Sequence, residues 1–228
     1  MMHSQHRGAE PGCAMACTMA LCLMLGALMQ SGKAVAQSAF DEAFRAVEVN
    51  AVNDLKRLLA RGIDPNTADR DGMTLLARAA EAGSRDVANV LLASGARADA
   101  RNRFGESPLM YAALRGHEGI VRDMLTRQAQ VNPEAPAWSA LHYAALRGHV
   151  GIIDVLLERG ANVNSVSENG TTPLMLAASE GRLEAVQRLL KRGADPRLES
   201  DGARTATWWA LQGDHRKVAD LLAASGAP

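Results

Sequence analysis

The chain repeats itself with a period of about 33 residues, and this period constrains its fold more than any other feature. A pair of bulky apolar residues recurs as Leu58-Leu59, Leu91-Leu92, Met124-Leu125, Leu156-Leu157, Leu189-Leu190 and Leu221-Leu222. The steps between the pairs are 33, 33, 32, 33 and 32 residues. Periods of roughly 20–50 residues are typical of stacked arrays, in which small supersecondary units bury a continuous core only together.

Two short helices are predicted in each repeat. Apolar residues at helical spacing, such as Val150, Ile153 and Leu156, indicate one helix, and Gly160 supplies a left-handed residue to end it. An earlier helix begins after a hydroxyl residue that caps its free amides, often with proline in the first turn. The boundary between the two helices is marked, eight residues before each apolar pair, by Asn50, Gly83, Gly116, Gly148, Gly181 and Gly213.

The starts of the first helices resemble the T-P-L-H-x-A-A motif of the ankyrin-repeat family. The matching segments are Ser107–Ala113, Ser139–Ala145 and Thr172–Ala178, and Gly160–Asn164 is similar to the family's G-A-D-V-N turn. The resemblance covers residues 40–228. It implies an all-α solenoid of six helix-turn-helix repeats with short β-hairpin loops, at about 40–71, 72–104, 105–136, 137–169, 170–201 and 202–228.

The repeats depart from the pattern at the ends and once in the middle. The first helix is polar, as suits the uncovered end of a stack, and Trp209 is aligned with the alanines of the internal repeats. Repeat three is one residue short, with Gln128 in place of the capping glycine and with Pro133 and Pro136 in its loop. A local irregularity is expected there.

Residues 1–36 are predicted to be a signal peptide. Ala14–Met29 carries no charge, and Ala34-Val35-Ala36 is the small-x-small pattern that precedes cleavage, here before Gln37. An uncleaved anchor is the alternative, but a spanning helix needs about 20 apolar residues. The mature domain, 37–228, is therefore expected in the periplasm or outside the cell, without stable membrane insertion. It contains no cysteine, since all three lie before residue 37. The Ala-rich leader and the Ala-Val-Ala-Gln cleavage context favour a bacterial origin, and a eukaryotic secreted origin is the alternative.

Catalytic and cofactor chemistry has no candidate residue in the sequence. The chain has no G-x-S-x-G, P-loop or G-x-G-x-x-G, so neither an enzyme nor a cofactor is expected. His117 and His149 follow glycines one repeat apart, but stacked helices hold equivalent atoms roughly 10 Å apart, too far to share a metal ion. Their imidazoles are expected to bond to neighbouring backbone. Twenty-five basic and 25 acidic residues balance, which argues against a nucleic-acid partner.

The resemblance implies that a partner protein is bound through the concave face, which the hairpin tips and the exposed side of the first helices line together. The residues that correspond to these places in the middle repeats are Arg103, Phe104, Leu114, Arg115, Trp138, Leu146 and Arg147. Apolar, aromatic and arginine side chains together are typical of interface hot spots. In the competing interpretation, Leu114 and Leu146 pack on each other along the stack and Trp138 compensates for the irregular loop. Tyr111 and Tyr143 are interpreted as half-buried core residues.

The leading hypothesis for function is a monomeric protein-binding module of the cell envelope that assists an enzyme or acts as an immunity protein. One alternative is a scaffold that bridges two envelope proteins, which a second apolar patch on the convex side would favour. Another is a secreted effector that acts on a host protein. The sequence does not distinguish these roles.

Overall fold

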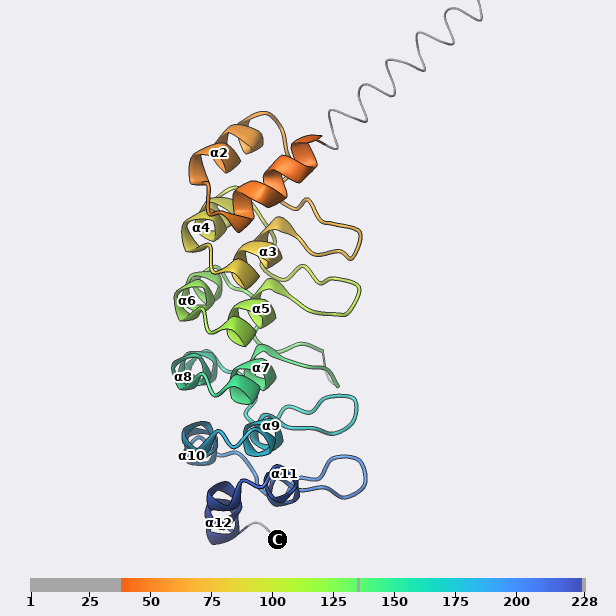
Figure 1. Cartoon of the computed structure of the whole chain (residues 1–228), viewed down its shortest axis with the longest axis vertical. Helices are drawn as coiled ribbons and strands as arrows, with labels where there is room; N and C mark the ends of the chain where they lie inside the picture. Colours follow the sequence, from red (N-terminus) through yellow and green to blue (C-terminus); the bar gives the residue numbers. More distant parts are fainter. Residues whose placement is uncertain (1–37, 135, 227–228) are drawn as a thin grey trace, which may run out of the picture. The chain divides into compact units, whose positions relative to one another are not determined.

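The computed structural model describes residues 38–134 and 136–226, and residues from Ala43 onward form one compact unit. The predicted signal peptide and its cleavage site lie outside the described residues. A helical stretch covers residues 38–48, and pairs of short helices follow it (Figure 1). The first helices of the repeats, called A helices here, are α3 (Leu75–Ala82), α5 (Pro108–Arg115), α7 (Ala140–Arg147), α9 (Pro173–Ser179) and α11 (Ala206–Gln212). The second, or B, helices are α2 (Val52–Ala60), α4 (Arg85–Ala93), α6 (Glu118–Thr126), α8 (Val150–Glu158), α10 (Leu183–Lys191) and α12 (Arg216–Ala224).

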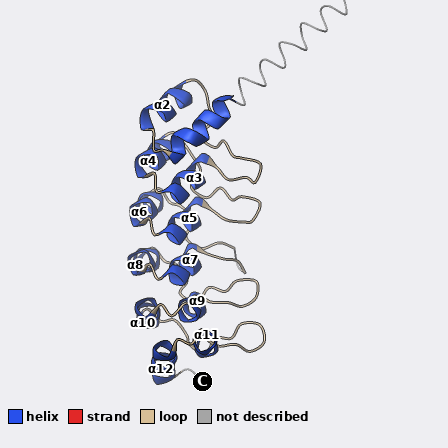
Figure 2. Ribbon diagram, viewed as in Figure 1, coloured by secondary structure: helices blue, strands red, loops and turns tan. Residues whose placement is uncertain are grey.

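The helices form two layers, one of A helices and one of B helices. Each A helix packs against the A helices before and after it, and the B helices follow the same order. Long loops join each B helix to the next A helix and extend to one side of the stack (Figure 1). The described part of these loops contains isolated bridges, Ala68 with Thr74 and Ser200 with Arg204, and no regular strand (Figure 2). The all-α solenoid predicted from the sequence is confirmed.

Alanine pairs allow the A helices to approach one another closely. Ala112 and Ala113 on α5 and Ala144 and Ala145 on α7 are fully buried, with no exposed surface. The bulky residues of the core come from both layers, with Leu109 and Leu141 on A helices and Ile120, Met124 and Leu156 on B helices. Because each repeat presents the same small and large positions to its neighbours, one core continues along the stack.

A side chain at the start of each B helix from α4 onward reaches back to the preceding repeat. His149 Nε2 lies 3.4 Å from the Leu114 carbonyl, and His117 and His215 make the same contact with Glu81 and Ser179 at 3.3 and 3.1 Å. A carbonyl only accepts, so Nε2 carries the hydrogen in each case. The expected backbone role of the Gly-His imidazoles is confirmed.

Arg182 and Ser84 take this place in the two repeats that lack the histidine. Arg182 Nε donates to the Leu146 carbonyl at 3.3 Å, and Ser84 Oγ donates to the Val47 carbonyl at 2.8 Å. The junction therefore depends on a donor at this position rather than on an imidazole.

The last repeat is aligned one residue differently from the sequence-based alignment. The B helices α10 and α12 begin at Leu183 and Arg216, a step of 33, so the predicted final step of 32 is wrong. Leu222 is the fully buried leucine of α12. Asp214, with φ +56°, and not the predicted marker Gly213, is the left-handed residue between α11 and α12. By the same shift, Trp209 takes the place of Tyr111 and Tyr143, and the aligned alanine is the buried Ala210.

The junction gives a test at Gly116, whose φ is +82° and where an added Cβ would lie 2.8 Å from the His149 ring. Gly95 has a similar φ of +89° but open space around it. We expect Gly95→Ala to lower the free energy of unfolding by about 1 kcal/mol, the cost of a left-handed alanine. Gly116→Ala should lose roughly 1 kcal/mol more, because His149 must leave its carbonyl. Urea unfolding checks this.

A double variant, Gly116→Ala with His149→Ala, serves as the control for that mechanism. Its loss should be smaller than the sum of the two single losses, since one ring is responsible for both. Equal losses in Gly95→Ala and Gly116→Ala would show that the ring contact has no energetic role.

Candidate functional site

Backbone hydrogen bonds tie most neighbouring loops to each other. Arg103 N donates to Asp71 O at 3.0 Å, which joins loop 61–74 to loop 94–107. Loop 127–139 is joined to loop 159–172 through Ala137 N and Val166 O at 3.2 Å. Asp201 N continues the row by donating to Asn169 O at 3.0 Å.

An asparagine in three of the loops adds a second tie to the following loop. The Asn66 amide donates to Gly95 O and accepts from Arg97 N, at 3.4 and 2.8 Å. Asn132 and Asn164 make the equivalent pair of bonds to the loops that follow them. In loop 94–107 the corresponding residue is Asp99, a carboxylate with no hydrogen to donate.

Loops 94–107 and 127–139 lack both ties. Between their described residues the structure has no hydrogen bond, and we call this gap the seam. Its position coincides with the missing residue, since Pro108 and Ala140, the starts of α5 and α7, are 32 residues apart instead of 33. Gln128 takes the left-handed conformation of the absent glycine, with φ +62°. The irregularity predicted in repeat three is therefore confirmed, and it breaks the row of loops.

A pocket of about 300 Å³ opens along the seam. Its walls include three aromatic and two acidic residues. These are Phe104, Trp138, Tyr143, Glu106 and Glu168, together with Arg101, Gly105, Met110 and Ala137. A second hollow of about 410 Å³ shares Arg101 and Ala137 and is lined by Gln130, Pro133 and Glu134. Phe104 is 65% exposed and Trp138 36% exposed, so both present apolar surface to solvent.

Glu106 links the repeats on the two sides of the seam. One of its oxygens accepts from the Tyr111 hydroxyl at 2.5 Å and from the Asn102 amide at 3.0 Å, and the other accepts from the Tyr143 hydroxyl at 2.9 Å. Burial opposes ionisation of Glu106, but these bonds outweigh it and lower the pKa of the carboxyl. The pKa values of both tyrosines are raised, by burial and by the carboxylate. The sequence-based interpretation of the tyrosines as half-buried is confirmed, whereas it missed Glu106.

Trp138 and Phe104 differ in how they are held. Trp138 lies directly before Ser139, the cap of α7, with its ring centroid 5.2 Å from Tyr143 and 5.6 Å from His142. Trp138 was expected at a hairpin tip, but the short loop places it at the base. Phe104 occupies the tip of its own loop, with the Arg103 guanidinium 4.7 Å from its ring centroid. The two predicted aromatic residues line the same pocket.

The other predicted binding residues do not line this pocket. Arg103 is paired with Asp71 at 2.9 Å and Arg115 with Glu81 at 2.8 Å. Arg147 is exposed and has no ion pair or hydrogen bond within the described residues. The expectation that Leu114 and Leu146 are exposed is wrong. Both are half-buried, because α5 and α7 lie side by side and each flank is covered by the next repeat.

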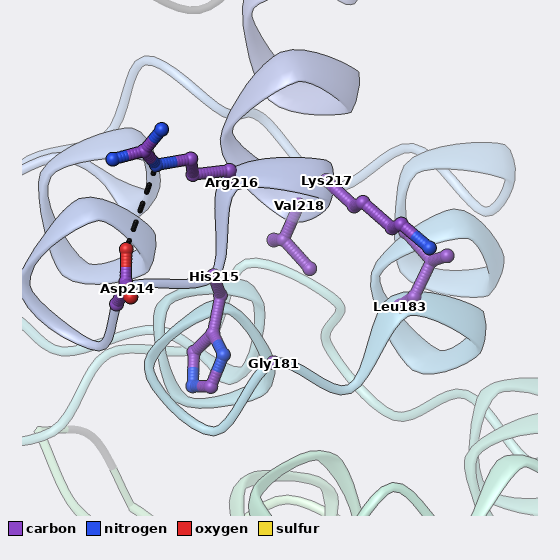
Figure 3. A pocket seen from close by; sticks show the side chains of 7 residues that line it. All are labelled: Gly181, Leu183, Asp214, His215, Arg216, Lys217 and Val218. Atoms are coloured by element: carbon purple, nitrogen blue, oxygen red, sulfur yellow. Dashed lines mark ion pairs between the residues drawn. The ribbon is translucent and has the colours of Figure 1, made fainter.

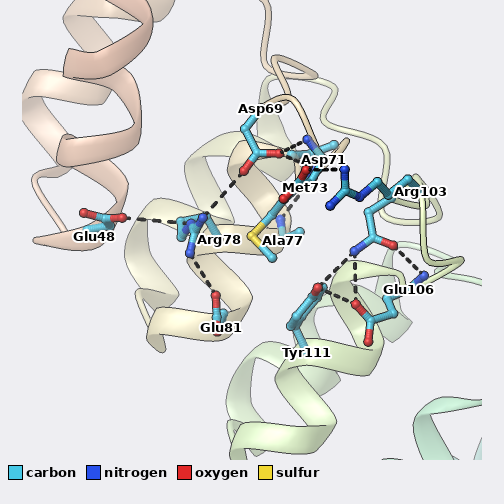
Figure 4. A network of polar contacts seen from close by, with 12 residues as sticks. Glu48, Asp69, Asp71, Met73, Ala77, Arg78, Glu81, Arg103, Glu106 and Tyr111 are labelled. Carbon is cyan, nitrogen blue, oxygen red and sulfur yellow. Dashed lines mark hydrogen bonds and ion pairs between the residues drawn. The ribbon is translucent and has the colours of Figure 1, made fainter.

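The A-helix face changes from polar to apolar along the stack. Arg78 on α3 takes the place that Tyr111 has on α5, and it lies 3.1–3.9 Å from the carboxylates of Glu81, Asp69 and Glu48 (Figure 4). Figure 4 also shows the Asp71–Arg103 pair and the Glu106–Tyr111 contact beyond it. On the α3 side of the seam, the charged side chains of the A-helix face are thus paired with one another.

A further hollow of about 400 Å³ lies where α12 follows α10 (Figure 3). It is lined by Gly181, Leu183, Asp214, His215, Arg216, Lys217 and Val218. The His215 ring is already bonded to Ser179 O, and Arg216 faces Asp214 at 3.6 Å. Because it offers no Phe, Tyr or Trp side chain and its histidine maintains the repeat junction, we assign this hollow to the stack and not to a binding site.

Metal and membrane chemistry have no counterpart in the described part of the chain. Residues 38–134 and 136–226 place no group of three or more His, Cys, Asp or Glu side chains where they would hold a metal ion. Within the same ranges no helix has the length and apolar character needed to span a bilayer.

The comparison with known proteins agrees with stacked helix pairs. A family model described as ankyrin repeats (3 copies) matches residues 43–135, 94–167 and 141–228. The crystal structure of the human ASB11 ankyrin repeat domain is similar with a TM-score of 0.75 and 27% identity, over 82% of this chain and 84% of that one. The chain belongs to the ankyrin-repeat family. Ankyrin repeats generally mediate protein–protein interaction and are typically not enzymes.

Curated relatives share the repeats within much longer proteins. The human transient receptor potential cation channel subfamily A member 1 is 30% identical over 180 residues, which are 75% of this chain and 16% of that protein. The Drosophila melanogaster protein mask, which contains ankyrin repeats and a KH domain, is 41% identical over 88 residues, 36% of this chain and 2% of that protein. The chain thus spans less than a fifth of the length of these relatives.

His142 lies beneath Trp138 and is fully buried. Its Nε2 donates to the Thr171 carbonyl at 3.0 Å, so Nδ1 accepts from the Ser139 amide and hydroxyl at 3.1 and 2.8 Å. The equivalent residues in the neighbouring repeats are Met110 and Met175. Burial lowers the pKa of His142 to about 4, against the ordinary value of 6.5.

This burial predicts a dependence of stability on pH. The unfolded chain binds the His142 proton near pH 6.5 and the folded chain only near pH 4, so stability is lost as the pH falls between these values. The loss should be roughly 2–3 kcal/mol, from about 1.4 kcal/mol per pKa unit. Urea midpoints for wild type and His142→Met, measured from pH 7.5 to 4.5, should diverge in favour of the variant at low pH. Parallel curves would contradict the prediction.

Proposed function

We propose that the chain is a binding module of the cell envelope that holds one protein partner across the seam. Phe104 and Trp138 are the anchors of this surface, and Arg147, at the far end of α7 from Trp138, is a cation without a described partner on the same helix. The observation that carries the proposal is the pocket between Phe104 and Trp138, at the one place where the described row of loops is open. Aromatic anchors at a pocket, surrounded by charged side chains, are typical of interface hot spots.

The competing structural role of Trp138 does not account for its exposure. The rings of Tyr143 and His142 lie 5.2 and 5.6 Å from the indole, yet 36% of Trp138 remains exposed. Phe104 is 65% exposed and its described contacts are with the guanidinium of its neighbour Arg103. Two large apolar side chains that share a pocket and remain open to solvent are more surface than folding alone requires.

Site-specific photo-crosslinking tests the proposal. The photoreactive residue p-benzoylphenylalanine, placed at position 104, should give one discrete cross-linked product in the cells that make the protein. At Gln187, an exposed residue of α10, it should give none. Trp138→Ala should reduce the product at position 104 by about tenfold or more, as expected for loss of a hot-spot aromatic.

The folding of each variant is checked by circular dichroism and by its urea midpoint. A product that persists undiminished in folded Trp138→Ala would assign the partner to another face. The same product from position 187 would indicate contact without specificity.

A second candidate function is a scaffold that bridges two envelope proteins. The observation in its favour is a hollow of about 410 Å³ on the B-helix side, lined by Leu59, Val90 and Ala93 with Lys56, Asn89 and Ser94. The same photoreactive residue at Val90 separates the two functions, because only a scaffold gives a second, different product there.

Export and processing belong to the same proposal. The uncharged run Ala14–Met29, the Ala34-Val35-Ala36 motif and the absence of cysteine after residue 36 support a bacterial protein that works in the periplasm or beyond the cell. Within that compartment an immunity role and an enzyme-assisting role both use a single bound partner, and an effector role places that partner in a host.

Intact mass measurement tests export directly. Protein recovered from the periplasmic fraction should begin at Gln37 and lack the first 36 residues. Replacing Ala34 and Ala36 by arginine should block cleavage and leave the full-length mass with the membranes. Full-length protein in the cytoplasm of wild-type cells would overturn the export proposal without affecting the proposed binding surface.

A further inference from the structure

We propose that the seam pocket receives a cationic side chain, arginine or lysine, from the partner protein. The inference rests on the proposed function, because it identifies the chemistry of the group that the partner inserts. It is drawn from the aromatic and acidic walls of the pocket, from the charges left without partners there, and from the contacts that its aromatic rings already make.

The walls combine π faces with carboxylates. Phe104, Trp138 and Tyr143 line the same pocket as Glu106 and Glu168. A cation is attracted to the face of an aromatic ring when it lies within about 6 Å of the ring centroid, and most strongly to tryptophan. A carboxylate at the same site adds a charge-assisted hydrogen bond.

Glu168 is the carboxylate of the pocket that is free to accept hydrogen bonds from a bound group. Its side chain is exposed and makes no hydrogen bond or ion pair with any described residue. Glu106 is held ionised by Tyr111, Asn102 and Tyr143, but only Tyr143 bonds to its second oxygen. Glu134, in the adjoining hollow, is likewise without a described partner.

Arg101 is the one cation in the lining, and it is already engaged. Its guanidinium donates to the Gly105 carbonyl at 2.6 Å, at the edge of the pocket. The two carboxylates of the pocket outnumber this one guanidinium, and Glu134 in the adjoining hollow adds a third negative charge. The remaining charge in the pocket is negative, which favours a positive occupant over an acidic one.

The chain itself shows that these rings accept guanidinium groups. Arg103 lies 4.7 Å from the Phe104 centroid, and Arg204 lies at the same distance from Trp208. In the pocket, Trp138 offers a comparable ring without an arginine over it in the described structure. A cationic side chain from the partner would lie over the Trp138 ring as the Arg103 guanidinium lies over the Phe104 ring.

NMR titration with a small cationic probe tests the inference. The probe is Nα-acetylarginine methylamide, its neutral control is the citrulline analogue, and the signal is the indole N–H of Trp138. The chain has three tryptophans, so Trp138→Phe assigns that signal and Trp208 and Trp209 serve as internal references. We expect a saturable shift of the Trp138 signal with the arginine probe and binding of the citrulline probe about tenfold weaker.

Matched acidic-to-amide variants separate a specific carboxylate from net charge. Glu168→Gln should weaken the arginine probe about fivefold, whereas Glu184→Gln, the same change at an exposed residue of α10, should leave it unchanged. Equal binding of both probes, no effect of Glu168→Gln, or no saturable shift up to about 50 mM probe would each overturn the inference. Preferential binding of Nα-acetylglutamate methylamide would overturn it too, and would make Arg101 the specificity residue.

The result is independent of the crosslinking at position 104. A partner that requires Trp138 while the pocket ignores arginine leaves the proposed function standing and removes only the cationic occupant. A pocket that binds arginine in a chain whose crosslinks do not depend on Trp138 leaves the chemistry of the pocket standing and removes the proposed partner surface.

Discussion

The contact between the start of each B helix and the repeat before it is the interaction on which the rest of the structure depends. A donor side chain reaches a carbonyl at the end of the preceding A helix, and the histidines among these donors lie against a residue without a side chain. The contact fixes both the spacing and the rotation of successive repeats, because it joins the two helices of one repeat to the first helix of another. Arg182 shows that the geometry, and not the imidazole, is what must be kept. The positions of the loops follow from this series of contacts between repeats.

The seam shows what such a scaffold tolerates. Omission of one residue between α6 and α7 leaves the A helices side by side and the core continuous, because the change is absorbed in a loop. Its effect appears at the surface, where the loops no longer meet. Where the backbone hydrogen bond between the loops is missing, a side-chain hydrogen bond from Tyr143 to Glu106 connects the two repeats. Both residues also line the pocket. A small local change therefore produced a distinct site without a change of fold.

Much of the fold could be predicted from the sequence because its signals are periodic. The apolar pairs, the hydroxyl caps and the glycines recur, so each prediction was supported several times over. The alignment of the last repeat was wrong because Gly213 looks like the glycine that marks the other repeats, whereas the left-handed residue is Asp214. A sequence pattern favours glycine over aspartate for a left-handed position. Glu106 was missed because nothing local distinguishes it, and its role arises only when Tyr111 and Tyr143, one repeat apart, point to the same carboxylate. Asp99 stands where the loops before and after it have Asn66 and Asn132. This difference was the sign of the seam that the sequence offered.

The missing ties divide the loop row into two blocks, loops 61–74 and 94–107 on one side and the three later loops on the other. Each block is held internally by backbone bonds, so an occupant seated between them contacts both at once and supplies the connection that the chain omits. Binding would then slow amide hydrogen exchange in the loops on both sides of the seam together. A partner bound at the seam would therefore stabilise the row of loops at the place where the described loops make no hydrogen bond to each other.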